Sequence, residues 1–242
     1  MRVLACLAAL LLLTACSYSP APKVEVLKPS YVEAVRALQI RNVPVVDETL
    51  EILRLMFARD GDEFVNICTV SHINREQHLW LTAAHCVKDI GEEGRYINGL
   101  PVEVVEADEL RDLAVLKLPG YTGGRELPLQ QQTPRWGQDI VVVGHPFGYH
   151  DVFITRGYIA NPLVMLNGPY MVFDVAGAPG NSGSPVLNLQ GELVSVLQIG
   201  WGRSFSPITG GAPYMPLKLF LSRYLPAPIS LDDSGILVLN PF

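Results

Sequence analysis

The sequence predicts a fold built mainly from β-strands, and two of its features carry that prediction. From Glu63 onward, short apolar and β-branched runs recur roughly every 10 to 15 residues, with turn residues between them. Hydrophobic residues make up 49% of the 242 and charged residues 17%, so the chain can bury a substantial core. Many short strands at this spacing are typical of sandwiches and barrels.

Nine runs are predicted to be strands, and a connection over residues 129–137 (LQQQTPRWG) divides them into two halves. The runs are FVNICTV, LWLTAAH, VEVVEA, LAVLKL, DIVVVG, VFITRGYIA, YMVFDV, SPVLN and ELVSVLQIG. Residues 31–40 and 48–58 have apolar positions three and four apart, which predicts two short N-terminal helices. Residues 216–225 predict a closing C-terminal helix.

The N-terminus predicts export. The uncharged run Val3 to Ala15 is shorter than the ~20 residues of a membrane-spanning helix and matches the apolar region of a secretory signal. It ends in LTAC, which resembles the bacterial lipobox, where cleavage precedes a lipidated cysteine, here Cys16. The alternative is an ordinary signal cleaved nearby. We therefore expect a signal peptide (1–15), a Pro/Ser-rich tether (16–30) and a folded domain (31–242) held by lipid at the periplasmic face of a membrane.

Charge and cysteine content limit the remaining partners. The formal net charge is −6 and the basic residues are scattered, so nucleic acid is not an expected partner. If Cys6 leaves with the signal and Cys16 carries lipid, Cys68 and Cys86 remain as a pair in an oxidising compartment. We expect a disulfide between them, with two buried free thiols as the alternative.

One glycine-rich segment, GAPGNSGSPVLN (177–188), places Ser182 before an apolar strand. A serine hydroxyl is a weak nucleophile and needs a base, a group to orient that base, and donors for the oxyanion. His85 in LTAAHC, at the end of an apolar strand, and Asp112 before the run LAVLKL are the candidate base and acid. The backbone N–H groups of Gly180 and Ser182 are the candidate oxyanion donors.

These motifs resemble the trypsin-like serine protease superfamily. LTAAHC, DLAVLKL and GNSGSP occur in the order His85, Asp112, Ser182, and the likeness covers residues 63–225. It implies the chymotrypsin fold, two packed antiparallel β-barrels over roughly 60–128 and 135–225, and a peptide-hydrolysing Ser-His-Asp triad without a cofactor. A binding module without turnover and an esterase are the alternatives.

Two branches of the superfamily stay open. VGHPFGYHDVFITRGYIA (143–160) and Asp174 are similar to the bacterial HtrA group. FDVAGAPGNSGSPVLN (173–188) is equally similar to the staphylococcal glutamyl endopeptidases. The resemblance places Ala176 at the base of the substrate pocket. Its wall lies in VSVLQIGWG, with Val196 and Leu197. None of these pocket residues is charged, so we expect an uncharged, small to medium apolar side chain before the scissile bond.

The other histidines suggest no further site. His72 and His78 flank a predicted hairpin turn, and His145 and His150 lie in the loop GHPFGYH. Solvated loop positions are expected for them, because no carboxylate or cysteine stands at a metal-ligand spacing. We therefore expect protein or peptide substrates and no metal ion.

Overall fold

The fold is described from a computed structural model. The residues described are 53–60, 63–88, 94–121, 125–201, 206–225, 229–231 and 237–239. The predicted signal peptide, Cys16, the tether and the helix expected over 31–40 lie outside these residues.

The first half is a seven-stranded antiparallel sheet with the order β5-β4-β1-β2-β3-β7-β6. Its strands are β1 (Leu53–Asp60), β2 (Glu63–Asn74), β3 (Leu79–Thr82), β4 (Arg95–Ile97), β5 (Leu100–Pro101), β6 (Glu103–Asp108) and β7 (Leu113–Lys117). β5 and β6 stand at opposite ends of this order, yet only Val102 separates them along the chain. The sheet therefore curves so that its two end strands come close together at Val102, without pairing to each other.

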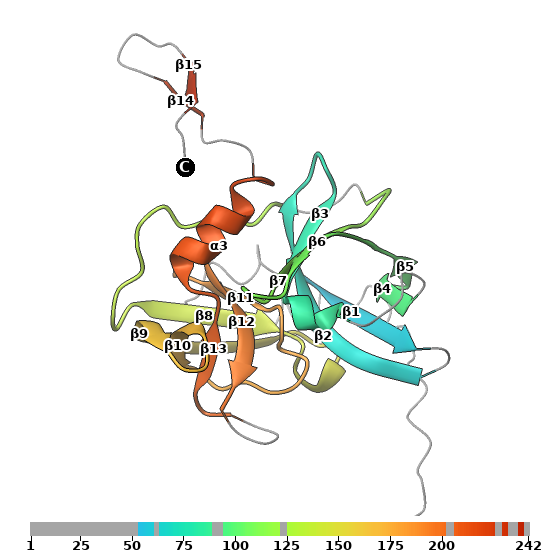
Figure 1. The fold of residues 1–242 in the computed structure, drawn as a ribbon, viewed down its shortest axis with the longest axis horizontal. Helices are drawn as coiled ribbons and strands as arrows, with labels where there is room; N and C mark the ends of the chain where they lie inside the picture. Colours follow the sequence, from blue (N-terminus) through green and yellow to red (C-terminus); the bar gives the residue numbers. More distant parts are fainter. Residues whose placement is uncertain are drawn as a thin grey trace, which may run out of the picture. The chain divides into compact units, whose positions relative to one another are not determined.

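The second half is a closed barrel with the order β10-β13-β12-β11-β8-β9, shown opposite the first sheet in Figure 1. Its strands are β8 (Asp139–Gly144), β9 (Phe153–Met165), β10 (Pro169–Asp174), β11 (Pro185–Leu187), β12 (Leu193–Gly200) and β13 (Thr209–Gly211). Helix α3 (Tyr214–Leu221) follows, and β14 (Ile229–Leu231) pairs with β15 (Leu237–Leu239). The molecule thus has the predicted all-β architecture of two packed antiparallel units and a C-terminal helix.

All nine predicted strands are confirmed, and the closing helix begins two residues earlier than expected, at Tyr214. The helix predicted over 48–58 is wrong from Leu53 onward, because these residues form β1. β1 pairs with β2 along one edge and with β4 along the other, so backbone hydrogen bonds to two neighbours replace those of a helix. The first sheet consequently starts before residue 60.

Strands β3 and β7 lie between two hydrophobic cores. On β3, Leu79 and Leu81 pack into a large core shared with the second barrel, whereas Trp80 packs into a smaller core inside the first sheet. β7 alternates in the same way, because successive side chains of a strand point to opposite faces. The ends of β3 and β7 are therefore held from both sides, and the candidate site residues follow β3 and precede β7.

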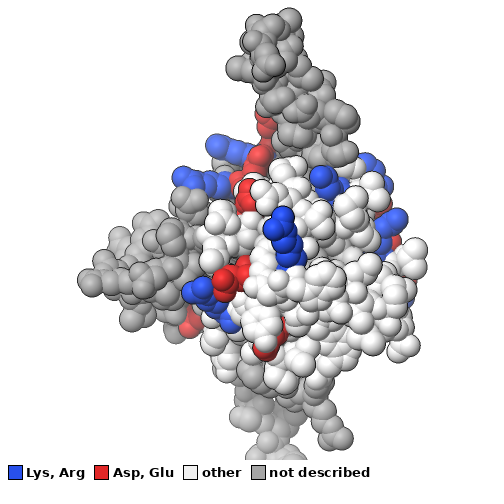
Figure 2. All heavy atoms as spheres, turned by 90° about the vertical axis from the view of Figure 1, so that its left-hand side faces the viewer, with Lys and Arg blue, Asp and Glu red and all other residues white. Residues whose placement is uncertain are grey.

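The surface carries charges of both signs without a basic stripe on the face that Figure 2 shows, where blue and red side chains are scattered among uncharged ones. Among the described helices, none is both long and apolar enough to cross a bilayer.

Candidate active site

His85 and Asp112 are directly hydrogen-bonded. His85 lies in a 3-10 helix, Ala84–Cys86, three residues beyond the end of β3 rather than on the strand as expected. Its ring Nδ1 is 2.8 Å from Asp112 Oδ2, and its backbone N–H donates to Asp112 Oδ1 at 2.8 Å. Because a carboxylate only accepts, Nδ1 carries the proton and Nε2 keeps the lone pair that a base uses.

Asp112 is held by its backbone as well. It has a left-handed conformation, φ 50°, which aspartate tolerates better than most residues. Gln198 of β12, 8% exposed, donates from Nε2 to the carbonyls of Arg111 (2.6 Å) and Asp112 (2.8 Å). The second barrel thus fixes the acid of the first sheet. Gln198 was not among the predicted site residues, although an amide inside an apolar strand is a signal that it needs buried partners.

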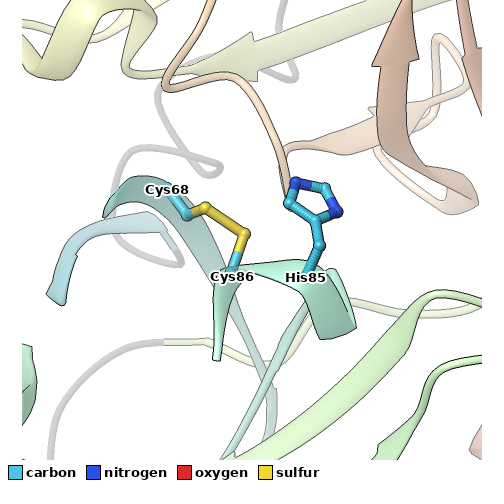
Figure 3. Close-up of side chains that lie close together, drawn as sticks. All are labelled: Cys68, His85 and Cys86. Carbon is cyan, nitrogen blue, oxygen red and sulfur yellow. A yellow bond between two sulfur atoms is a disulfide. The ribbon is translucent and has the colours of Figure 1, made fainter. Parts of the chain in front are cut away.

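A disulfide lies beside the histidine. Cys68 of β2 and Cys86 are joined with an S–S distance of 2.04 Å, and both are fully buried. Figure 3 shows the His85 side chain next to this bridge. The two sulfur atoms and a ring nitrogen of His85 lie within 4.8 Å of one another, but zinc binds thiolates, and these sulfurs are bonded to each other.

The loop that carries Ser182 pairs most of its backbone polar atoms. Each carbonyl from residue 179 to 182 accepts a hydrogen bond: Pro179 from Phe147 N (2.5 Å), Gly180 from Thr69 Oγ1 (3.1 Å), Asn181 from Ser184 N (3.0 Å) and Ser182 from Thr69 N (2.8 Å). The N–H groups of Asn181 and Gly183 donate to Ala178 O and Leu197 O. Among residues 180–184, and counting acceptors in the described part of the chain, only the N–H groups of Gly180 and Ser182 find no protein acceptor.

Each of the two remaining N–H groups points away from the hydrogen bond made by the preceding carbonyl. A trans peptide directs its C=O and its N–H to opposite sides. The Pro179 carbonyl faces Phe147, so the N–H of Gly180 faces the other way, and the Asn181 carbonyl orients the N–H of Ser182 likewise. Gly180 has φ +95°, and a Cβ atom there would lie 2.4 Å from His145 O, so the position requires glycine.

The serine loop meets the first sheet where β2 and β3 diverge. A Cβ atom on Gly183 would lie 2.2 Å from both Thr69 O and Thr82 Oγ1. Thr82 ends β3, three residues before His85, so this contact brings half-buried Ser182 to the side of the histidine. Within the described residues no hydrogen bond joins Ser182 Oγ to His85, and such bonds often tighten only when substrate binds.

Two of the three predicted pocket residues lie around Gly177. Half-buried Ala176 precedes it, and a Cβ atom on Gly177 would lie 3.8 Å from Leu197 Cδ2 and 2.6 Å from Thr209 Cγ2. Val196 is fully buried in the core, and its place in the pocket wall stays a prediction. The two side chains that a Cβ atom on Gly177 would meet are thus uncharged.

Two histidines expected in solvated positions are buried. His72 on β2 is 0% exposed, with Nδ1 3.0 Å from Arg125 O, and His145 is 5% exposed. Burial lowers the pKa of both rings, because it disfavours the charged imidazolium. The N–H of His145 donates to Thr69 Oγ1 at 3.1 Å, which places His145 directly beneath the serine loop.

Two all-β units that bring a histidine–aspartate pair to a serine loop with two unengaged amides are typical of serine peptidases with the chymotrypsin fold. The sequence model of the trypsin-like peptidase domain matches residues 68–196, slightly more than half of the chain. The chain belongs to this family.

Three relatives indicate the branch. The chain is 34% identical over 105 residues to a probable periplasmic serine endoprotease DegP-like of Pseudomonas savastanoi pv. phaseolicola, 37% over 106 residues to that of Hahella chejuensis, and 36% over 128 residues to that of Halomonas elongata. The matches cover 40%, 40% and 48% of this chain but only 21%, 21% and 26% of the relatives. Of the two branches left open by the sequence, they favour the HtrA type.

Proposed function

We propose that this chain is a serine endopeptidase that cleaves proteins or peptides with His85, Asp112 and Ser182. The observation that carries the proposal is which backbone groups of the serine loop have hydrogen-bond partners and which do not. Buried backbone groups are nearly always paired, and among the N–H groups of residues 180–184 only those of Gly180 and Ser182 lack an acceptor in the described part of the chain. Two unengaged donors beside a serine are what a tetrahedral oxyanion needs.

In this mechanism each residue has one role. Ser182 Oγ attacks the carbonyl carbon of the scissile peptide while His85 Nε2 accepts its proton and the carbonyl electrons move to the oxygen. Gly180 N and Ser182 N donate to that oxyanion. His85 then gives the proton to the leaving amine as the C–N bond breaks, and water, activated by the same base, releases the acid and restores the hydroxyl. Asp112 holds the imidazole tautomer and stabilises the imidazolium.

The substrate and the location of the enzyme follow from the pocket and the N-terminus. The uncharged surroundings of Gly177 favour a small to medium apolar side chain before the scissile bond. The signal-like N-terminus with Cys16, together with relatives named as periplasmic, supports an exported, lipid-anchored enzyme of the cell envelope. The bridge between Cys68 and Cys86 suits an oxidising compartment.

A fluorophosphonate probe tests the proposal without knowledge of the substrate, because it reacts with an activated serine. Wild-type protein should be labelled, and Ser182→Ala should not. Ser184→Ala is the matched control: this neighbouring serine is buried and its Oγ bonds to nothing in the described part of the chain, so labelling should persist. Equal labelling of Ser182→Ala, or none of the wild type, contradicts the proposal. Peptide and ester substrates then separate an endopeptidase from an esterase.

A further inference from the structure

Thr69 of β2 holds the serine loop at two of its carbonyls. It is fully buried, and its backbone N–H donates to Ser182 O at 2.8 Å. Its side-chain Oγ1 lies 3.1 Å from Gly180 O and 3.1 Å from the N–H of His145. A residue of the first sheet therefore bonds to both ends of the segment that contains the two unengaged donors.

The direction of each hydroxyl bond follows from chemistry alone. A carbonyl can only accept and a backbone N–H can only donate, whereas a hydroxyl can do one of each at the same time. Thr69 Oγ1 must therefore accept from His145 and donate to Gly180. The hydroxyl hydrogen of Thr69 therefore lies in the hydrogen bond to the Gly180 carbonyl.

The hydrogen bond from Thr69 Oγ1 restricts the backbone conformation of Gly180, which has no side chain to restrict it. Gly180 has no side chain and φ +95°, so its backbone has unusual freedom. The peptide before it is held where Phe147 N–H donates to Pro179 O, and the peptide after it is held where Thr69 Oγ1 donates to Gly180 O. With both peptide planes fixed, the direction of the Gly180 N–H is fixed as well.

We propose that Thr69 is a positioning residue for the oxyanion site: its hydroxyl keeps Gly180 in the conformation that presents its N–H to the substrate carbonyl. The inference rests on the proposed function. Thr69 itself touches no reacting atom. Without the hydroxyl, the Gly180 carbonyl is left buried and unpaired, and it regains a partner most easily by rotating its peptide plane.

The test compares Thr69→Val, which keeps the shape and removes the hydroxyl, with Thr69→Ser, which restores it. Ser195→Ala is the matched control, because Ser195 is also fully buried and donates to a backbone carbonyl, Ala212 O at 2.6 Å, away from the serine loop. Three quantities are measured: the fluorophosphonate labelling rate, the dissociation constant of a peptide boronic acid with an alanine-like residue at boron, and the free energy of unfolding.

We expect Thr69→Val to label about 10- to 100-fold more slowly and to bind the boronic acid, whose adduct places an oxygen in the oxyanion site, more weakly by a similar factor. Thr69→Ser should recover to within about threefold of wild type. Ser195→Ala should lose stability but keep its labelling rate. If Thr69→Val does not fold, Thr69→Ala against Thr69→Ser makes the same comparison.

Unchanged labelling in Thr69→Val, an equal loss in Ser195→Ala, or no recovery in Thr69→Ser overturns the inference. Failure of the proposed function looks different, because then the wild-type protein itself is not labelled.

Discussion

In the first sheet, His85 and Asp112 lie on short connections beside β3 and β7 and bond directly to each other. In the second barrel, Ser182 lies on a loop whose hydrogen bonds run largely to other parts of the chain, two of them to Thr69. The acid and the base thus bond to each other within one half, with Gln198 of β12 supporting the backbone of Asp112, whereas the nucleophile and its donors depend on contact between the two halves. Substitutions in each half test this difference between the acid–base pair and the serine loop.

The largest effect is expected from Asp112→Asn, which breaks the local pair of the first sheet. An amide can present its NH2 group to Nδ1 and stabilise the wrong tautomer of His85, so turnover should fall by about 10⁴-fold with the fold retained. The fluorophosphonate labelling rate measures the loss of activity, and circular dichroism shows whether the fold is retained. Asp139→Asn, which removes an exposed carboxylate paired with Arg156 at 3.3 Å, should behave as wild type. A loss below tenfold in Asp112→Asn would remove Asp112 from the mechanism.

Gly180→Ala alters the serine loop of the second barrel. It should lower the labelling rate by about 10²- to 10³-fold, the usual effect of losing one oxyanion donor. The new Cβ would meet His145 O at 2.4 Å, so the peptide must move. Gly120→Ala is the control, because Gly120 also has positive φ, +79°, but nothing lies within 4 Å of its Cβ position. If both variants lose activity equally, backbone strain and not the position of the donor explains the effect.

The disulfide is the covalent restraint of the first half, and its loss should act on stability more than on chemistry. Cys68 and Cys86 are 18 residues apart, and closing a loop of this size stabilises the fold by ~3 kcal/mol in the chain-entropy estimate. Reduction should therefore lower the melting temperature, whereas Cys68→Ala/Cys86→Ala should not respond to reductant. Two free thiols in protein purified under non-reducing conditions would show that the bridge does not form.

The smallest effect concerns pH. Burial lowers the pKa of His72 in the folded protein, so below about pH 6.5 the unfolded chain binds more protons than the folded one. The free energy of unfolding should decrease as the pH falls, by at most about 1.4 kcal/mol per pH unit for this one ring. His72→Phe fills the site beside Trp80 and Tyr121 and should reduce that slope in urea titrations between pH 7.5 and pH 5, leaving the part that buried His145 contributes. Equal slopes in both proteins would contradict this origin.

Much of the fold could be predicted because its strands are strongly apolar and regularly spaced, so all nine expected runs are strands. The prediction failed at β1, where apolar spacing alone does not separate a helix from a strand. Pairing with β2 and β4 decides that segment. From the sequence, His72 and His145 are expected in solvated positions beside a turn and in a loop, but packing between distant segments buries both.

The sequence by itself determined the class of fold and the candidate triad, because strand periodicity and the motifs around His85, Asp112 and Ser182 are local in the chain. Only the tertiary structure decided what supports that site. Gln198 holds the backbone of Asp112, and Thr69 holds the loop of Ser182. Each of these contacts joins residues more than 80 positions apart. The physical reason is that these hydrogen bonds depend on where two distant segments lie in space, and a local pattern in a single sequence does not determine that.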